Sequence, residues 1–408
     1  MRTRFLAFLL IAAMLAPVSG MAELDFFSPT PPPTASPVPI LSGEALLESP
    51  PMTLNCASAL LLEPHSGQII FDMNADAPRP VASVTKVMTI LLTLEAIEAG
   101  RISPDDRVTI STEAAGMGGS QVLLDVGESQ SIAVLLKSMI VGSANDAAVA
   151  LAEVLYGSEE LCAAQMNRRA AELGMTNTHF VNCTGLPADG QHTTARDVAI
   201  MSSAMFSHPL YYDFSKIWLD NVDHGDGRIT QLTNTNKLIR LYDGCDGGKT
   251  GSTSEAGYCI TATAQRGGMR LIAVILGAPS GTERFDIAKE MFDYGFANYR
   301  LYPVAQRDTP VRGGLPVISG EKNSVALRLD GELTLLMLKG AEQNIQLVPD
   351  LPESVNAPVQ AGQIIGSVKV IVEGKNAASI PIAAAETVDA KGFRHGLRRF
   401  WQQWLVDF

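Results

Sequence analysis

The hydrophobic positions change their period several times along the chain, and each change predicts an element. Residues 57–62 and 68–72 alternate between apolar and polar positions around a turn that ends at Gly67, which predicts two paired strands. Over residues 84–99 the apolar positions recur every three or four residues, which predicts a helix that ends at Gly100. The first folded part therefore begins with two strands and a helix.

The central part of the chain has a helical period. Residues 131–173 predict mostly helix, with an interruption at residues 141–145, and residues 193–207 predict another helix. The apolar face of the first helical run carries Ile132, Leu135, Leu136 and Met139. The interruption reads Val-Gly-Ser-Ala-Asn, so it places polar side chains between two helices and is a candidate place for chemistry.

Beyond these helices the period returns to that of strands. Residues 247–251, 258–265 and 269–276 are separated by Ser, Thr and Gly turns and predict a three-stranded meander, followed by a helix at residues 284–299. Strands at both ends with helices between them predict an α+β domain over residues 53–301. In such a domain the terminal segments share one antiparallel sheet with helices packed on it.

After residue 302 the pattern consists of short strands. They are predicted at residues 324–329, 333–338, 345–348 and 364–372, with Gly-rich turns between them. This indicates a small all-β domain over residues 302–388, which is within the usual size of a domain. None of its residues forms a constellation that we expect to be catalytic.

The N-terminal segment predicts export. Two arginines precede the apolar residues 5–15, and small residues stand at Gly20 and Ala22, which predicts a signal peptide at residues 1–22. An uncleaved membrane helix is the weaker alternative, because a span needs about twenty apolar residues. The proline-rich residues 23–52 predict an extended linker. We therefore expect an exported protein, for which ATP is not an expected substrate.

The C-terminal residues 389–408 predict an amphipathic helix. Apolar side chains recur at three- and four-residue spacings, at Phe393, Leu397, Phe400, Trp401, Trp404, Leu405 and Phe408. Arg394, Arg398 and Arg399 lie on the opposite side of such a helix. Tryptophans and a basic face suit a membrane interface, which predicts an anchor on the outer face of the cytoplasmic membrane. The alternative is a helix that packs on its own β-domain.

Composition and charge exclude several function classes. The formal net charge is −12, and it becomes more negative when the signal peptide is removed, so we expect no nucleic-acid partner. The five cysteines are widely spaced without a C-x-x-C, and the six histidines are scattered without H-E-x-x-H. We therefore expect no metal and no cofactor. The sequence leaves open whether one or two disulfides form.

The segment from Gly244 to Thr250 has some likeness to a phosphate-binding loop. That loop requires four residues between its first glycine and Gly-Lys-Ser/Thr, but only three separate Gly244 from Gly248. The residues that follow predict a strand, whereas a phosphate-binding loop is followed by a helix. A nucleotide site is therefore disfavoured, and the Lys-Thr-Gly needs another explanation.

Three short motifs follow one another along the chain: Ser83-Val-Thr-Lys86, Ser143-Ala-Asn145 and Lys249-Thr250-Gly251. Each alone is common, as a helix cap with a solvated lysine, a loop, or a surface charge. Together they fall at a helix start, a break between helices and a strand edge, which can converge on one cleft. A serine and a lysine at i and i+3 share one helix face, which suits a nucleophile with an amine base beside it.

The order of these motifs resembles that of the serine penicillin-recognising enzymes. The flanking stretches narrow the resemblance to the low-molecular-mass penicillin-binding proteins that are D-alanyl-D-alanine carboxypeptidases. These stretches read RPVASVTKVMT, GSQVLLDVGE, LLKSMIVGSANDAAVALAE, ELGMTNTHFVNCTGLP and GGKTGSTSEAGYC. The likeness is close over residues 55–300 and looser beyond. It implies the penicillin-binding/β-lactamase-like transpeptidase fold, with peptidoglycan pentapeptide stems and β-lactam antibiotics as partners.

The resemblance also implies roles for the catalytic residues. Ser83 attacks the carbonyl of the penultimate D-alanine and forms an acyl-enzyme that water hydrolyses. Lys86 takes the serine proton and must be neutral, which requires a pKa lowered by burial and by the nearby Lys249. Ser143 relays the proton to the leaving amine.

Further roles concern the substrate. Asn145 is expected to bind an amide of the stem peptide, and Lys249 with Thr250 to hold the terminal carboxylate. Gly251 is expected to let the backbone approach the substrate. The amides of Ser83 and Ser252 are expected to donate to the oxyanion. Many relatives carry histidine where Ser252 stands, so a side-chain role at that position is in doubt.

Rival functions remain on the same fold. A class A β-lactamase carries a glutamate on a loop between the second and third motifs, and no E-x-x-L-N occurs between Asn145 and Lys249. An inactive binding module is disfavoured because all three motifs are intact. A peptidoglycan endopeptidase that cleaves cross-links uses similar chemistry, and the sequence does not separate it from a carboxypeptidase.

Overall fold

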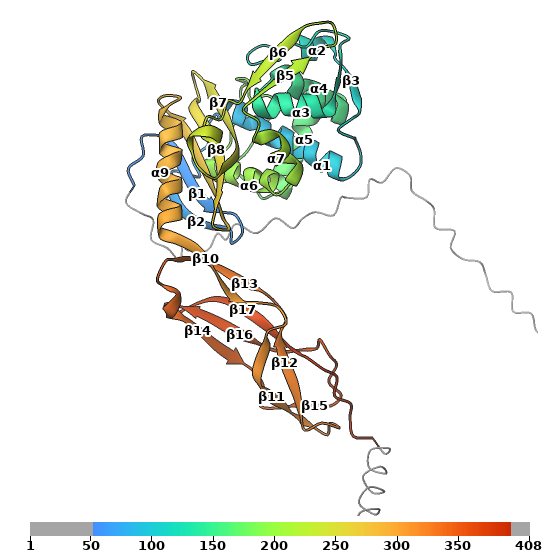
Figure 1. Ribbon diagram of the computed structural model, residues 1–408, viewed down its shortest axis with the longest axis vertical. Helices are drawn as coiled ribbons and strands as arrows, with labels where there is room; N and C mark the ends of the chain where they lie inside the picture. Colours follow the sequence, from blue (N-terminus) through green and yellow to red (C-terminus); the bar gives the residue numbers. More distant parts are fainter. Residues whose placement is uncertain (1–51, 393–408) are drawn as a thin grey trace, which may run out of the picture. The chain divides into compact units, whose positions relative to one another are not determined.

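The computed structural model describes residues 52–392 (Figure 1). The expected signal peptide (1–22) and most of the expected linker (23–52) and tail (389–408) lie outside the described residues. These three predictions are therefore left without a structural account.

The first domain is built on a five-stranded antiparallel sheet. Its order is β2 (Gln68–Met73), β1 (Ser58–Glu63), β9 (Met269–Ala278), β8 (Gly257–Arg266) and β7 (Cys245–Thr253). The first two strands of the chain thus join the last three strands of the domain, which confirms the prediction from the sequence. Strand β7 pairs with β8 and forms one edge of the sheet.

Helices cover both faces of this sheet (Figure 1). Every residue of β1 is buried, because alternate side chains enter two different cores. Leu60 and Leu62 pack in the core that contains α1 (Lys86–Glu98) and α6 (Ala195–Phe206). Leu61 packs in the other core, which contains α9 (Glu283–Asn298). The sheet is therefore the middle of three layers.

The remaining elements of this domain form a largely helical part. They are the helices α2 (Thr112–Ala115), α3 (Ile132–Val141), α4 (Asn145–Tyr156), α5 (Glu159–Glu172), α7 (Pro209–Ser215) and α8 (Leu238–Leu241), and the hairpins β3 (Arg107–Thr109) with β4 (Ser129–Ser131) and β5 (Leu219–Asp223) with β6 (Ile229–Thr233). The predicted interruption is confirmed, since α3 ends at residue 141 and α4 begins at residue 145.

Local signals explain where these helices begin and end. The Ser131 side chain accepts a hydrogen bond from the Val134 amide and caps α3. A second break between α4 and α5 was not predicted. There Gly157 adopts a left-handed conformation with φ of 91°, and the Ser158 side chain caps α5. The Gly157-Ser158 pair is therefore a sequence signal that ends one helix and begins the next.

The second domain is all β, as predicted. Its strands are β10 (Tyr299–Ala305), β11 (Pro310–Ile318), β12 (Ser324–Leu329), β13 (Leu333–Leu338), β14 (Ile345–Asp350), β15 (Val355–Asn356), β16 (Ile364–Val372) and β17 (Lys375–Ala384). Six of them form a sheet of order β14-β16-β17-β12-β11-β15, and β10 pairs with β13. β10, β11, β15 and β17 were not predicted.

The edges of the second domain differ slightly from the predicted limits. Strand β10 already begins at Tyr299, so it crosses the limit predicted at residues 301 and 302. At the other end the Glu321 amide donates to the Asp389 carbonyl, and the Lys391 amide donates to the Ser319 carbonyl, both at 2.8 Å. The β-domain therefore extends to residue 391.

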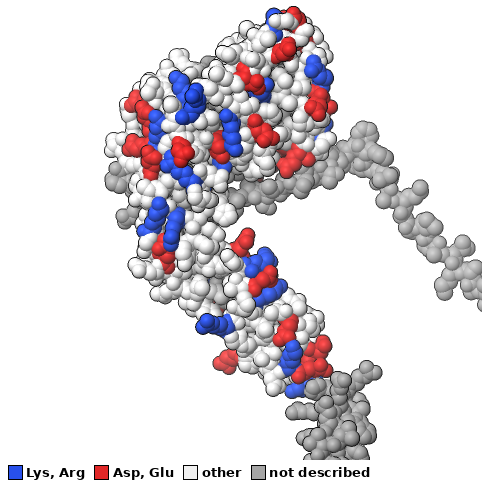
Figure 2. Space-filling model, in the orientation of Figure 1, with Lys and Arg blue, Asp and Glu red and all other residues white. Residues whose placement is uncertain are grey.

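Two further findings concern the described part as a whole. Among its helices none is long and apolar enough to cross a membrane. All five cysteines are free thiols, so no disulfide connects them in this structure. On the face shown in Figure 2, Lys and Arg side chains are interspersed with Asp and Glu.

Candidate active site

The first motif lies in a tight turn that leads directly into α1. A 3₁₀ turn, η1 (Ala82–Thr85), precedes Lys86, the first residue of α1. Ala82 has a φ of 49°, an unfavourable conformation for a residue with a side chain, of the kind found at functional sites. Lys86 Nζ donates to Ser83 Oγ at 3.1 Å. The turn thus places the predicted nucleophile and base in contact.

The Lys86 amine lies in a buried cage of acceptors. Besides Ser83 it donates to Asn145 Oδ1 at 2.5 Å and to the Thr184 carbonyl at 2.6 Å, and its side chain is fully buried. Burial lowers the pKa of Lys86 to about 7, while Cys183, Glu159 and Asp146 act in the opposite direction. A substantial neutral fraction therefore exists near neutral pH. Burial, the first cause named in the sequence argument, is the largest cause of the lowered pKa.

Lys249 forms a second buried lysine-serine pair. Its Nζ donates to Ser143 Oγ at 2.7 Å and to the Thr250 carbonyl at 2.8 Å. Burial, followed by the charges of Lys86 and Arg284, holds the pKa of Lys249 well below its usual range. The repulsion between the two lysines therefore disfavours the state in which both are charged. A carboxylate bound beside this amine would favour its charged form.

The second motif connects the two lysines. Ser143 has a left-handed φ of 64° in the link between α3 and α4, and its hydroxyl contacts Lys249. Asn145, two residues later, contacts Lys86, and its Nδ2 donates to the Gly118 carbonyl at 2.6 Å. Both ends of the Asn145 amide are therefore engaged by the protein, and the residue positions Lys86.

Two glycines allow other segments to lie against the nucleophile turn. A Cβ atom at Gly251 would lie 2.6 Å from the Val81 carbonyl oxygen and 2.8 Å from the Ser83 amide nitrogen. A Cβ atom at Gly185, whose φ is 83°, would lie 2.0 Å from the Ala82 carbonyl oxygen. The predicted close approach at Gly251 is thus made to the turn that carries Ser83. This approach places the Lys249-Thr250-Gly251 motif directly against the turn of the Ser83-Val-Thr-Lys86 motif.

The remaining predicted residues flank Gly251 on β7. Thr250 is buried beside Lys249, whereas Ser252 is exposed and lines a groove along the end of the strand. Their backbone follows the edge of the sheet, because no described strand pairs with β7 opposite β8. All eight predicted site residues therefore gather around one place, where α1, the α3-α4 link and β7 meet.

Several supporting residues were not predicted. Asp146 accepts hydrogen bonds from the Val122 amide at 3.0 Å and the Leu124 amide at 3.2 Å. These bonds hold residues 122–124, which lie in the connection between β3 and β4. Arg284 on α9 donates to the Gly251 carbonyl at 3.1 Å. Asp146 adjoins a motif and could have been noticed as a first-turn acid of α4, while nothing in the local sequence distinguishes Arg284.

These contacts define a class of protein. The site has a serine hydroxyl beside a buried lysine with a lowered pKa, a second serine-lysine pair and a sheet edge that no described strand covers. This is the arrangement of a serine enzyme that forms an acyl intermediate.

Comparison with known proteins gives the particular family. Residues 45–280 match the model of the D-alanyl-D-alanine carboxypeptidase family, Peptidase_S11, and residues 299–390 match the C-terminal domain of penicillin-binding protein 5. The chain belongs to the Peptidase_S11 family of D-alanyl-D-alanine carboxypeptidases, which are serine-type hydrolases.

Individual relatives are similar to this chain over most of its length. The chain is 37% identical to the D-alanyl-D-alanine carboxypeptidase DacF of Bacillus subtilis, over 85% of this chain and 89% of that protein. It is 31% identical to DacC of Escherichia coli, over 96% and 95% of the two chains. The crystal structure of penicillin binding protein 5 from Haemophilus influenzae has a TM-score of 0.74 at 30% identity, covering 84% of this chain and all of that one (100%). The predicted fold and family are confirmed.

Proposed function

We propose that this enzyme removes the terminal D-alanine from peptidoglycan stem peptides through an acyl-enzyme on Ser83. The observation that carries the proposal is the 3.1 Å contact between Ser83 Oγ and the buried Lys86 amine. A neutral amine at this distance can accept the hydroxyl proton as the oxygen attacks a carbonyl. The family match supports the same chemistry.

Acylation then proceeds through a series of proton transfers. Ser83 Oγ bonds to the carbonyl carbon of the penultimate D-alanine while its proton passes to Lys86. The C–N bond to the terminal D-alanine breaks, and Ser143 gives its hydroxyl proton to the leaving nitrogen. Lys86 then returns a proton to Ser143, using the one that it took from Ser83. Because Lys249 Nζ donates to Ser143 Oγ, the Ser143 hydrogen is free to be donated elsewhere. Water hydrolyses the ester and returns the enzyme to its starting state.

Recognition of the terminal carboxylate is assigned to Lys249 and Thr250. In the free enzyme burial disfavours the charged Lys249, and a bound carboxylate supplies the opposite charge that favours it. The close approach of Gly251 to the Ser83 amide supports an oxyanion site between the amides of Ser83 and Ser252. Substrate binding and charge stabilisation thus use the same edge of β7.

The assay that tests this function measures free D-alanine released from a pentapeptide stem. We expect release by the wild type and none above background by Ser83→Ala. Cleavage of cross-linked dimeric muropeptides is measured in parallel, because an endopeptidase would act on these. Faster cleavage of dimers than release of D-alanine would replace the carboxypeptidase assignment by the endopeptidase one.

We also propose that the chain is exported and held at the outer face of the cytoplasmic membrane by residues 393–408. The support is the sequence of the N-terminal segment and the apolar and basic faces expected of the tail. Because Asp389 and Lys391 bond to the β-domain, the truncation that tests this ends at Gly392. We expect that form to leave anionic vesicles yet retain activity on soluble peptides. Retention on the vesicles, or unfolding, contradicts the anchor.

A further inference from the structure

The Thr184 carbonyl, which accepts a hydrogen bond from Lys86 Nζ at 2.6 Å, belongs to a short segment that contacts the base. This segment comprises residues 182–185, which form neither helix nor strand. One residue earlier, the Cys183 carbonyl accepts from Thr89 Oγ1 at 2.7 Å. Lys86 and Thr89 both lie in the first turn of α1, so the 182–185 segment turns two successive carbonyls toward this helix.

The carboxylate of Glu159, the first residue of α5, holds the 182–185 segment. Its Oε1 accepts from the Cys183 amide at 3.0 Å and from the Cys183 thiol at 3.1 Å. Cys183 is fully buried, and a buried amide needs an acceptor, which a carboxylate provides strongly. The place of the Thr184 carbonyl, one peptide further along the chain, therefore depends on Glu159.

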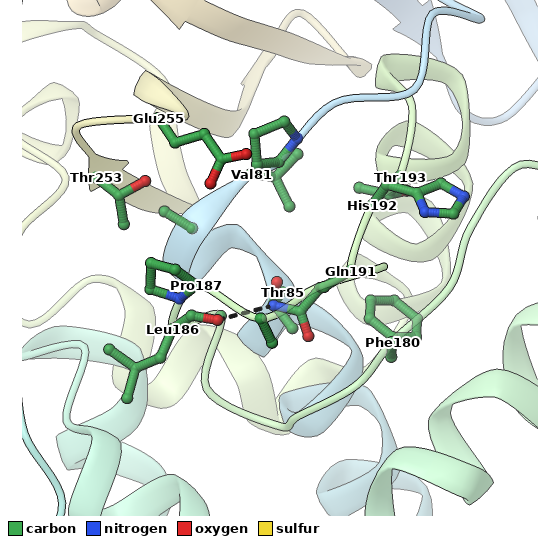
Figure 3. A pocket seen from close by; sticks show the side chains of 14 residues that line it. Val81, Thr85, Phe180, Leu186, Pro187, Gln191, His192, Thr193, Thr253 and Glu255 are labelled. Atoms are coloured by element: carbon green, nitrogen blue, oxygen red, sulfur yellow. Dashed lines mark hydrogen bonds between the residues drawn. The ribbon is translucent and has the colours of Figure 1, made fainter.

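Two amide side chains fix the rest of this part of the chain. Asn182 Oδ1 accepts from the Gly185 amide at 2.7 Å, which closes the 182–185 segment into a turn. Gln191 Oε1 accepts from the Asn182 amide at 3.0 Å, and its Nε2 donates to the Leu186 carbonyl at 3.3 Å (Figure 3). Neither of these side chains binds the Cys183 amide, which leaves that role to the carboxylate at the start of α5.

The Glu159 carboxylate also supplies a negative charge near the base. Burial lowers the pKa of Lys86 to about 7, and Cys183, Glu159 and Asp146 oppose this effect. Burial raises the pKa of Cys183 well above its usual range, so near neutral pH its thiol is uncharged. The charges that favour the Lys86 ammonium are therefore the carboxylates of Glu159 on α5 and Asp146 on α4. Lys249 on β7 acts in the opposite sense, because two ammonium groups repel each other.

We propose that Glu159 is a positioning residue for the general base, which holds the Thr184 carbonyl in place through the Cys183 amide and sets a negative charge near the Lys86 amine. The inference rests on the proposed function and adds to it a residue that does not contact the nucleophile. The hydrogen bond from the Cys183 amide needs an oxygen acceptor, whereas the effect on the base needs a charged carboxylate. Two substitutions of Glu159 can therefore separate the two contributions.

The test measures the second-order rate constant of acylation by benzylpenicillin as a function of pH. For the wild type this rate constant should rise with pH to a plateau, because the neutral amine is the form that accepts the serine proton. In Glu159→Gln the amide oxygen can still accept from the Cys183 amide, so the plateau should be kept. The lost charge disfavours the Lys86 ammonium, so the midpoint of the rise should move to lower pH. Below the wild-type midpoint, this variant should be acylated faster than the wild type.

Two further variants make the result specific. Glu159→Ala removes the acceptor together with the charge, and we expect its plateau to be about tenfold lower, because the groups around the base are displaced. Glu160→Gln makes the same change of net charge on the adjacent, exposed side chain of α5 and should keep the wild-type profile. Thermal unfolding of each variant shows that it is folded.

The outcomes separate this inference from the proposed function. A wild type that penicillin does not acylate overturns both. If the wild type is acylated, a midpoint that stays in place in Glu159→Gln, or moves equally in Glu160→Gln, overturns the positioning role while the role of Ser83 stands. A plateau of folded Glu159→Ala within about twofold of the wild type also overturns it. If the alanine variant does not fold, the two glutamine variants decide: a midpoint that moves to lower pH in Glu159→Gln alone establishes the positioning role.

Discussion

Replacing Gly251 by alanine tests how closely the third motif must approach the nucleophile. The added Cβ would lie 2.6 Å from the Val81 oxygen, 2.8 Å from the Ser83 nitrogen and 2.9 Å from the Val84 nitrogen. An ordinary contact begins at 3.4 Å, so β7 and the turn would have to separate by roughly 0.5–0.8 Å. All three neighbouring atoms belong to the backbone and cannot move aside by rotation of a side chain.

The expected effect is larger on catalysis than on stability. Overpacking of this kind costs about 1–3 kcal/mol of folding free energy. A displacement approaching 1 Å between catalytic groups lowers the rate by about 100-fold. We therefore expect Gly251→Ala to fold, with a lower Tm, and to be acylated by penicillin about 100 times more slowly than the wild type.

The assay is the second-order rate of penicillin acylation, measured together with thermal unfolding. Gly281→Ala is the matched control, because its Cβ would make only ordinary contacts of 3.5 Å with the Tyr258 ring. This control should be acylated at close to the wild-type rate. If Gly251→Ala is acylated within threefold of the wild type, the contact between β7 and the Ser83 turn is not needed for catalysis, and the reasoning is refuted.

Three other predictions concern the two lysines. Because the pKa of Lys86 is about 7 and its neutral form is the base, acylation by penicillin should rise with pH up to about 7 and level off above it. Asn145→Asp places a negative charge where Oδ1 now lies 2.5 Å from Lys86 Nζ, which favours the ammonium, so the rise should move to higher pH. An unchanged profile would show that Lys86 is not the titrating base. Lys249→Ala should lower kcat/KM about 10- to 100-fold for peptides with a free terminal carboxylate, and much less for their amides, because a charge-assisted hydrogen bond is lost. Equal losses on both peptides would remove Lys249 from carboxylate recognition.

Much of the fold could be read from local patterns. The meander β7-β8-β9 and the break between α3 and α4 were predicted because hydrophobic period and turn residues are local signals. Strand β17 was missed although Glu373 and Gly374, with φ of 50° and 78°, form the two-residue turn that joins it to β16. That turn lacks the Asn-Gly or Asp-Gly pair by which such hairpins are usually found.

The sequence proposed the members of the site and the contact between Ser83 and Lys86, but not the other contacts. The three motifs identify Ser83, Lys86 and Lys249, because chemistry requires these residue types at that spacing. Which group each side chain touches depends on segments far apart in sequence, such as the Thr184 carbonyl that binds Lys86. For the same reason the positioning role of Asn145 was not foreseen.

The central claim is that Ser83 is the nucleophile of a penicillin-recognising carboxypeptidase, and mass spectrometry of the penicillin adduct tests it most directly. The protein is treated with benzylpenicillin, digested, and the modified peptide is sequenced by fragmentation. The structure predicts one penicilloyl group per chain, on Ser83, and none on the Ser83→Ala variant. An adduct on Ser143 or another residue, or no adduct on the folded wild type, would contradict it.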